Sequence, residues 1–272
     1  MSAKVTKLGE RTLIGLFLVS SVLLVLYGPV WLMVIFSIFW ILMATGEFYN
    51  LLKKYGISLP KLIMLVINGL FPILYYLTKS FYPYLFLTFV IFIYALAFQK
   101  KFFSFVPHFL FSMFYLGFLP SHLLYLKDWI WSQDWSLSKR FLIALYPLGF
   151  TWINDTGGYI VGSLIGKHYL APQISPRKTY EGFIAGVIFG VGFSIIYLGR
   201  VFNFTTSKII VTALFLSCGA LVGDLLESGF KREAGVKDSS SLLGAHGGFL
   251  DRIDSLIITV PLFYYLLKLF LT

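Results

Sequence analysis

The sequence predicts an all-α, polytopic integral membrane protein with about nine transmembrane helices and a cytoplasmic N-terminus. The mean hydropathy is +0.83, and 58% of the residues are hydrophobic while only 12% are charged. Apolar runs of about 17 to 25 residues recur along the chain, which is the length that a helix needs to cross the hydrocarbon core of a bilayer. These observations exclude a soluble globular domain. We therefore attribute the net charge of +10 to topology and to attraction for anionic lipids or phosphates, and not to nucleic-acid binding.

The first predicted helix covers residues 13–27 and follows the basic residues Lys4, Lys7 and Arg11. This order of charge and apolar sequence resembles a signal peptide. However, no small-residue cleavage site stands out, and further apolar runs follow at once. We interpret the segment as the first transmembrane helix.

Eight more spans are predicted, at residues 29–46, 61–78, 81–98, 103–126, 141–163, 182–199, 208–227 and 248–271. Nine helices place the two ends of the chain on opposite sides of the membrane. With the N-terminus inside, 15 of the 22 Lys and Arg residues lie inside, and seven lie outside: Lys79, Lys127, Lys139, Arg140, Arg200, Lys208 and Lys268. The positive-inside rule favours this orientation. It places the polar segments 154–181 and 228–254 together on the cytoplasmic face of a cell inner (plasma) membrane.

The acidic residues are concentrated beyond residue 150. Eight of the 12 lie there: Asp155, Glu181, Asp224, Glu227, Glu233, Asp238, Asp251 and Asp254. We expect residues 1–150 to form a scaffold of five or six spans, and residues 151–272 to form the catalytic region with polar loops. No internal repeat is visible, which argues against an inverted-repeat transporter.

Three carboxylates predict a metal site. Asp251 and Asp254 are three residues apart, so on a helix they share one face. Asp224 ends the preceding span, and Glu227 follows one turn later. A hairpin of the last two helices, joined by a 21-residue loop between Glu227 and Phe249, would return Asp251 and Asp254 to the depth of Asp224. An oxygen-only set suits Mg²⁺; the alternative is helix-end ion pairs with Arg252 or Lys231.

Basic residues surround these acids, as phosphoryl or nucleotidyl transfer requires. Lys231, Arg232, Lys237 and Arg252 lie in the same stretch, and Arg177 and Lys178 lie in the other polar segment. The alternative is that such residues only set topology and bind anionic headgroups. That alternative suffices for other basic residues, namely Lys53, Lys54, Lys100 and Lys101.

Glycines and a helix start complete the predicted site. Gly244, Gly247 and Gly248 flank His246, and Gly157 and Gly158 follow Asp155. Glycine lets backbone N–H groups approach a phosphate closely, although in membrane proteins it more often serves helix packing, which we expect for Gly186 and Gly190. His246 is either a phosphate ligand or proton donor, or a structural residue. In the segment 175–182, Ser175 is expected to cap a helix that has Pro176 at its first position, which would make an anion site.

With these residues assembled, the chain resembles the phosphatidate cytidylyltransferase (CDP-diacylglycerol synthase) family. The family signature, Ser-x-x-Lys-Arg-x4-Lys-Asp, a short gap and His-Gly-Gly-x-x-Asp-Arg-x-Asp, is matched by Ser228, Lys231, Arg232, Lys237, Asp238, His246, Gly247, Gly248, Asp251, Arg252 and Asp254. Residues 175–182, Ser-Pro-Arg-Lys-Thr-Tyr-Glu-Gly, resemble a second family motif, with Arg177 in place of the usual lysine. Asp155 and Asp224 also fall where the family carries acids.

The resemblance implies transfer of the cytidylyl group of CTP to phosphatidic acid, giving CDP-diacylglycerol and pyrophosphate. The implied catalytic residues are Asp224, Asp251, Asp254, Lys231 and His246, and the first three would bind Mg²⁺. The implied substrate-binding residues are Arg177, Lys178, Ser228, Arg232, Lys237, Gly247, Gly248 and Arg252. A second, monovalent cation such as K⁺ and a homodimer are left open, and the expected partners are CTP, phosphatidic acid and membrane lipids.

Two alternatives remain in view. A CDP-alcohol phosphatidyltransferase shares the metal, the membrane and the liponucleotide, but its Asp-Gly-x2-Ala-Arg lead-in is absent. An ion-coupled transporter would use Asp224 and Asp254 in the membrane, but it would not need a basic, glycine-rich loop. The sequence leaves open cytosine recognition, acyl-chain preference and the roles of Glu47, Asp155 and Glu181.

Overall fold

The computed structural model describes the backbone of residues 2–202 and 204–271, and within these ranges the side chains from residue 12 onward except that of residue 245. The side chains of Lys4, Lys7 and Arg11, on which part of the predicted orientation rests, lie outside the described residues.

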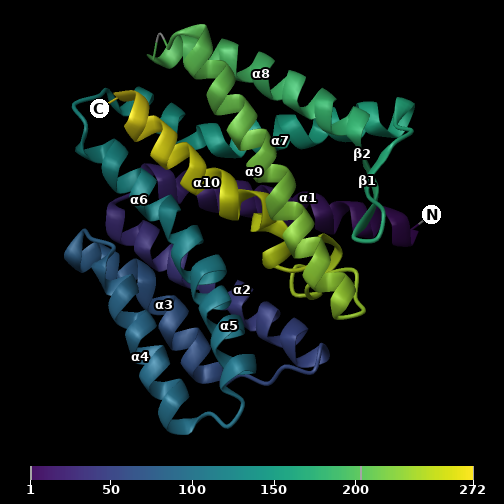
Figure 1. Cartoon of the computed structure of the whole chain (residues 1–272). Coiled ribbons are helices and arrows are strands. Elements are labelled where there is room, and N and C mark those ends of the chain that lie inside the picture. Colours follow the sequence, from purple (N-terminus) through teal and green to yellow (C-terminus); the bar gives the residue numbers. More distant parts are fainter. Residues whose placement is uncertain (1, 203, 272) are drawn as a thin grey trace. The chain divides into compact units, whose positions relative to one another are not determined.

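Helices make up nearly all of the described chain (Figure 1). They are α1 (Ser2–Tyr27), α2 (Val30–Lys54), α3 (Lys61–Thr78), α4 (Tyr82–Phe98), α5 (Phe102–Ser112), the π-helical η1 (Met113–Phe118), α6 (Leu119–Ser132), α7 (Leu137–Ile165), α8 (Tyr180–Phe202), α9 (Thr206–Glu233), the 3₁₀ turn η2 (Gly244–His246) and α10 (Leu250–Leu271). Each predicted span falls on one of these helices, except that 103–126 falls on the continuous run from α5 to α6. The all-α prediction is confirmed.

The lengths and compositions of the helices fit a multi-pass membrane protein. Among the described residues, six helical segments are long and apolar enough to cross a bilayer: Val30–Lys54, Lys61–Thr78, Phe102–Ser132, Tyr180–Phe202, Thr206–Glu233 and Leu250–Leu271. Thr12–Tyr27 and Tyr82–Phe98 are shorter apolar helices. The number of crossings and the cytoplasmic N-terminus stay predictions.

The chain folds into two compact units. Unit 1 comprises Met1–Tyr125 and Glu233–Arg252, and unit 2 comprises Leu126–Arg232 and Ile253–Thr272. The division near residue 150 was predicted to separate a scaffold from a catalytic region, and the boundaries of the compact units lie elsewhere. In particular, the loop after α9 and the first residues of α10 belong to unit 1.

A buried polar cluster ties three helical segments of unit 1 together. Asn68 on α3 is fully buried, and its Nδ2 donates hydrogen bonds to Thr45 Oγ1 of α2 (3.1 Å) and to Ser112 Oγ of α5 (2.9 Å). Between apolar helices, such bonds and close packing replace the hydrophobic drive that lipid surroundings remove. They fix α2 against α3, which matters for the cavity described below.

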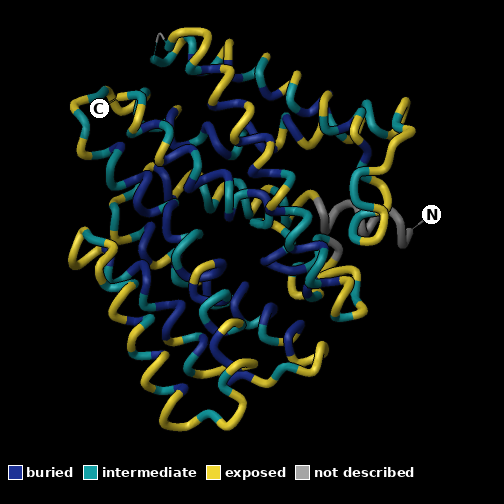
Figure 2. The backbone as a smooth tube through the Cα atoms, in the orientation of Figure 1, coloured by how far each residue is buried: buried dark blue, intermediate teal, exposed yellow. Residues whose placement is uncertain are grey.

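Small residues let α7 and α8 of unit 2 pack closely. A Cβ atom at Gly158 would lie 3.1 Å from the carbonyl oxygen of Gly182, and one at Gly186 would lie 2.9 Å from that of Asn154. One at Gly190 would lie 2.9 Å from the ring of Phe150. The predicted packing role of Gly186 and Gly190 is confirmed. Buried and exposed residues alternate along these helices (Figure 2).

Gly157 and Gly158 were considered for phosphate approach or for helix packing, and the structure shows packing contacts for them. Both lie inside α7, where the backbone N–H groups belong to the helix. A Cβ at Gly157 would lie 2.6 Å from the side chain of Phe189 on α8. These glycines therefore serve the contact between the two helices, which was the alternative interpretation.

A short β-hairpin connects α7 to α8 (Figure 1). Its strands β1 (Tyr169–Ala171) and β2 (Ser175–Thr179) are antiparallel, with Tyr169 opposite Thr179 and Ala171 opposite Ser175. The predicted helix cap at Ser175 is therefore wrong, since α8 begins only at Tyr180. Thr179 takes the capping role instead, because its Oγ1 accepts a hydrogen bond from the Gly182 amide at 3.2 Å.

Candidate functional site

Three carboxylates from three helices of unit 2 are close enough to interact electrostatically. Asp155 lies on α7, Asp224 on α9 and Asp254 on α10. Coulombic interactions link Asp254 to Asp224 and Asp155, and Lys231 acts on the same carboxylate. The structure thus brings together two of the three predicted metal ligands, Asp224 and Asp254. It adds Asp155, whose role the sequence left open.

Gly223 makes the approach of α9 to α10 possible. A Cβ atom at this position would lie 2.3 Å from the carbonyl oxygen of Asp254 and 3.1 Å from the Cα of Ser255. The Ser255 hydroxyl donates to the carbonyl of Ala220 at 3.4 Å, across the same contact. The predicted hairpin of the last two long helices is confirmed, and a glycine next to Asp224 is what lets the carboxylates come together.

The basic strand β2 reaches the carboxylate of Asp224. Lys178 Nζ lies 2.5 Å from Asp224 Oδ2, and Ser228 Oγ donates to Asp224 Oδ1 at 3.2 Å. The sequence predicted that the segment 154–181 faces the acids, and the structure places Lys178 there. Ser228, predicted to bind substrate, holds the Asp224 carboxylate in this structure.

A polar pocket of about 710 Å³ opens beside this ion pair. α7, the hairpin, α8 and α9 line it, and the lining combines acids, bases and aromatic rings: Asp155, Tyr159, Tyr169, Arg177, Lys178 and Asp224. Arg177 is exposed. A pocket of this size with two cations suits a phosphate-bearing ligand.

The C-terminal turns of α9 carry residues that the sequence placed in a loop. The predicted 21-residue loop is wrong, because α9 continues to Glu233, so Ser228, Lys231 and Arg232 are helical. Glu227 is fully buried and forms an i,i+4 ion pair with Lys231. A buried ion pair pays a large desolvation penalty, so it is weak evidence for stability. It does hold the Lys231 ammonium in one place.

Two further contacts fix the hairpin to its surroundings. Arg232 Nε donates to the carbonyl of Ile174 in the hairpin at 3.2 Å. The Glu181 carboxylate accepts from the backbone amides of Lys167 (3.1 Å) and His168 (3.3 Å), and it lies 2.5 Å from His168 Nδ1. Both contacts support the strand that carries Arg177 and Lys178. They give Glu181 a structural role, which the sequence could not assign.

In unit 1, the loop between α9 and α10 is organised around the buried carboxylate of Glu47 on α2. Its Oε1 accepts from Ser240 Oγ (2.6 Å) and the Phe249 amide (2.9 Å), and its Oε2 accepts from Ser239 Oγ (2.9 Å) and the Leu250 amide (2.8 Å). The acceptor also caps the N-terminus of α10, where free N–H groups and the helix dipole favour an anion.

Asp251 organises the same loop from the other side. Its Oδ2 accepts from the Gly248 amide (2.7 Å) and the Ser239 amide (3.0 Å), and it lies 2.8 Å from Ser239 Oγ, whose single hydrogen it shares with Glu47 Oε2. A Cβ at Gly248 would lie 2.1 Å from Ser239 Oγ and 2.6 Å from both Glu47 oxygens. Gly247 has φ +77°, which favours glycine. These glycines have a structural explanation, and their substrate-binding role stays a prediction.

The remaining predicted residues belong to unit 1 and lie on the loop or at the start of α10. Lys237 and Arg252 are exposed, and His246 is partly buried in the turn η2. Asp251 lies in the first turn of α10, the helix that further on carries Asp254 of unit 2, as predicted. Their roles toward a ligand stay predictions.

The donor set fits Mg²⁺. Within the described ranges, no group of three or more His, Cys, Asp or Glu side chains forms a complete metal-binding set. Mg²⁺ does not need one, because it prefers one or two carboxylates together with phosphates and water. Asp224 and Asp254 approach each other where Gly223 brings their helices together, and they supply the hard oxygen ligands that such a site requires. The residues present thus fit Mg²⁺, and a metal at this position stays a prediction.

The fold and the site together define a multi-pass helical membrane protein whose acidic and basic residues are suited to phosphate-bearing ligands. The chain belongs to the Cytidylyltransferase family, whose model matches residues 9–270. Similar proteins named phosphatidate cytidylyltransferase occur in staphylococci. That of Staphylococcus haemolyticus (strain JCSC1435) is 48% identical over 124 residues, covering 45% of this chain and 48% of the relative.

Two further relatives with the same name show a comparable likeness. The protein of Staphylococcus saprophyticus (strain ATCC 15305) is 45% identical over 124 residues, covering 45% of this chain and 48% of the relative. That of Staphylococcus epidermidis (strain RP62A) is 41% identical over 131 residues, covering 48% of this chain and 50% of the relative. The chain spans about half the length of the relatives it matches.

Sequence reasoning missed Gly223 and underrated Glu47. Gly223 stands in an apolar helix, where a glycine gives no sign of the backbone that it faces. Glu47 did carry a signal, because it is an acid directly after the predicted apolar span 29–46 and inside α2, and such a residue is costly to bury unless it has partners. Its partners lie about 190 to 200 residues away in the chain, so the sequence could not name them.

Proposed function

We propose that this protein transfers the cytidylyl group of CTP to phosphatidic acid, forming CDP-diacylglycerol and pyrophosphate. Membership of the Cytidylyltransferase family and the names of the staphylococcal relatives support this proposal. The observation that carries it is the Lys178–Asp224 pair at the edge of the polar pocket. This pair places the basic strand β2 beside the carboxylates of Asp155, Asp224 and Asp254. A reaction between two phosphates requires both positive side chains and metal-binding carboxylates.

In the proposed reaction, an oxygen of the lipid phosphate attacks the α-phosphorus of CTP. The bond between that phosphorus and the oxygen bridging to the β-phosphate breaks, and its electron pair leaves with pyrophosphate. The attacking phosphate is already ionised, so the reaction needs no strong protein base. This agrees with a site built from carboxylates, Lys and Arg.

The proposed roles follow from position and charge. Arg177 and Lys178 neutralise the triphosphate, which would displace the ammonium from its pairing with Asp224. Asp224 and Asp254 hold Mg²⁺, with Asp155 nearby. Held there, Mg²⁺ would supply positive charge that offsets the negative charge developing on the phosphates during transfer.

The family resemblance implies three further residues that act on substrate phosphates. Lys237 and Arg252 contribute positive charge, and His246 assists the departure of pyrophosphate. The assignment of Asp251 to the metal remains part of the proposal, because its Oδ2 already lies within hydrogen-bonding distance of three donors in the loop.

We further propose that the site faces the cytoplasm, where CTP is available, and that the protein resides in the cell inner (plasma) membrane. The excess of Lys and Arg on the predicted inner side supports this orientation. A monovalent cation such as K⁺ and a homodimer stay open, as they were from the sequence.

One assay tests the proposed reaction. Purified protein in detergent micelles receives Mg²⁺, CTP and phosphatidic acid, and pyrophosphate release is followed. The proposal predicts release that depends on both substrates. Release of CMP from CDP-diacylglycerol and an alcohol would instead indicate a phosphatidyltransferase. No turnover with any nucleotide or lipid would contradict both enzymatic assignments and favour a transporter.

A further inference from the structure

Unit 1 contains a second cavity, of about 790 Å³, which the proposed reaction does not yet use. It lies along α2 and α3, and most of its wall is aliphatic: Ile38, Leu42, Leu65, Val66, Leu70 and Ile73. Gly46 and Gly69 also line it, and a Cβ atom at Gly46 would meet nothing within 4 Å. The cavity is therefore a long apolar groove.

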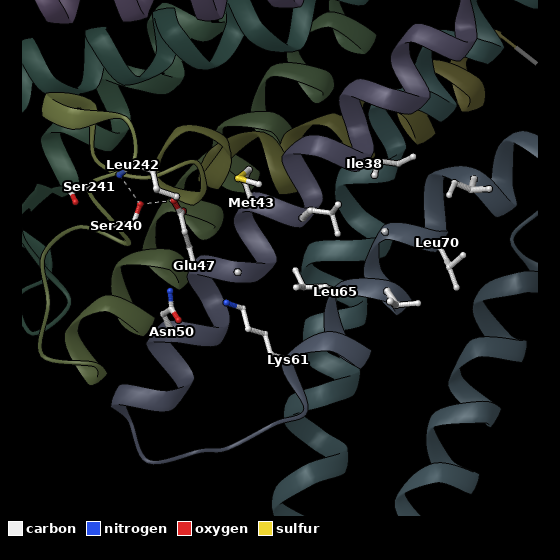
Figure 3. A pocket seen from close by; sticks show the side chains of 15 residues that line it. Ile38, Met43, Glu47, Asn50, Lys61, Leu65, Leu70, Ser240, Ser241 and Leu242 are labelled. Atoms are coloured by element: carbon white, nitrogen blue, oxygen red, sulfur yellow. Dashed lines mark hydrogen bonds between the residues drawn. The ribbon is translucent and has the colours of Figure 1, made fainter.

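The groove has one polar end (Figure 3). The polar side chains lie at this end, namely Glu47, Asn50, Lys61, Ser240 and Ser241. The aliphatic side chains of Ile38, Leu65 and Leu70 lie toward the other end. Lys61 is the one cation in the described lining, and it is exposed. The Glu47 carboxylate is taken up by four hydrogen bonds. The formal charges of Lys61 and Glu47 cancel, but the Glu47 oxygens are occupied by these donors, so an incoming anion would meet the exposed Lys61 ammonium and the neutral Ser and Asn side chains.

The apolar end opens along a surface suited to lipid. Val66 lines the groove and is 51% exposed on α3, and both α2 and α3 are apolar enough to cross a membrane. The polar end is formed in part by Ser240 and Ser241, which belong to the loop that carries the family signature. An amphipathic groove that joins this loop to the lipid-facing surface matches a molecule with an anionic head and an aliphatic chain.

We propose that this groove holds one acyl chain of phosphatidic acid taken from the surrounding bilayer, with the lipid phosphate at the polar end beside Lys61. The proposal rests on the proposed function and specifies where its lipid substrate binds. An acyl chain gains little hydrophobic energy on leaving other lipid chains. The groove therefore acts mainly by holding the lipid in one orientation, while Lys61 selects the anionic head.

Two matched pairs of variants test this assignment. Val66→Trp fills the groove, whereas Leu62→Trp, one turn earlier on α3, changes a 74% exposed residue outside the lining. Lys61→Ala removes the cation at the polar end, whereas Lys54→Ala removes an exposed cation outside the lining. Each variant is assayed with CTP and either dioleoyl or dihexanoyl phosphatidic acid.

Val66→Trp is expected to lower kcat/KM for the dioleoyl lipid about tenfold, equivalent to about 1.4 kcal/mol. Activity with the dihexanoyl lipid and the KM for CTP should stay unchanged, as should every parameter of Leu62→Trp. Lys61→Ala should lower kcat/KM for both lipids, because both carry the phosphate, and Lys54→Ala should not. The proposal would be overturned if the two Trp variants had equal effects. It would also be overturned if Val66→Trp lowered kcat/KM equally for the dioleoyl and the dihexanoyl lipid.

A binding measurement keeps this test separate from the proposed reaction. Phosphatidic acid with a photoreactive group in its acyl chain should label α2 and α3 in the wild type and less in Val66→Trp. Labelling confined to other helices contradicts the groove even if the enzyme is active. Labelling of α2 and α3 in a wild type that releases no pyrophosphate would retain a lipid site and refute the reaction.

Discussion

Glu47→Gln is the substitution that most sharply tests how the signature loop is held. Each oxygen of the carboxylate accepts one serine hydroxyl and one backbone amide: Oε1 from Ser240 and Phe249, and Oε2 from Ser239 and Leu250. A glutamine amide has only one acceptor oxygen. Whichever way it is turned, its NH₂ group faces a backbone N–H, which can only donate. The serine hydroxyl on that side can rotate to accept, but the backbone amide cannot.

The magnitude follows from this count. One buried backbone donor without a partner costs about 1–3 kcal/mol, and the bonds that remain lose the strength that comes from a charged acceptor. The neutral amide is easier to bury, which offsets part of the loss. We expect a net destabilisation of about 2–3 kcal/mol. At about 2–4 °C per kcal/mol, the unfolding midpoint should fall by about 4–12 °C.

The assay is thermal unfolding of the purified protein in detergent, with catalytic turnover measured at a temperature where the variant remains folded. Lys53→Gln is the matched control, since it places the same amide at an exposed position of α2 and should leave the midpoint unchanged. A Glu47→Gln midpoint within about 1 °C of the wild type would refute the reasoning. It would mean that these four bonds do not hold the loop.

Three further predictions concern unit 2. Gly223→Val should abolish activity and lower stability, because the Cβ of valine would lie 2.3 Å from a backbone oxygen of Asp254. Gly229→Ala on the same helix should be tolerated, since nothing lies within 4 Å of a Cβ there. Tolerance of both variants would contradict the packing argument. Lys178→Ala should raise the KM for CTP at least about tenfold in steady-state kinetics, because a charge-assisted contact with a phosphate is lost. Lys167→Ala, which removes a lysine at an exposed position, should leave the KM for CTP unchanged. Asp254→Asn should abolish turnover while circular dichroism and the unfolding midpoint indicate a folded protein, and near-normal turnover would remove Asp254 from the metal site.

The sequence predicted the helices well because their signal is local. An apolar run of sufficient length has few alternatives in lipid, so every predicted span falls on a helix. The packing of Gly186 and Gly190 and the facing of Lys178 toward Asp224 were also predicted. The first inference needed only the spacing of glycines along one helix. The second needed only the assignment of two polar segments to the same face of the membrane.

The errors occurred where local signals competed. Ser175-Pro176 is a good helix start, but hairpin pairing with Ala171 carries the segment past that point, and the helix begins five residues later at Tyr180. The glycines and serines of the signature loop suggested a phosphate-binding loop. Their observed contacts with Glu47 and Asp251 depend on partners that no local pattern specifies.

The proposed transfer itself is tested most directly by the fate of the phosphates of CTP. Purified wild-type protein is supplied with phosphatidic acid, Mg²⁺ and CTP labelled with ³²P at either the α or the γ position. Attack at the α-phosphorus predicts that the α label enters the lipid product and that the γ label appears in pyrophosphate. Release of the γ label as inorganic phosphate, or an unlabelled lipid with α-labelled CTP, would contradict the account.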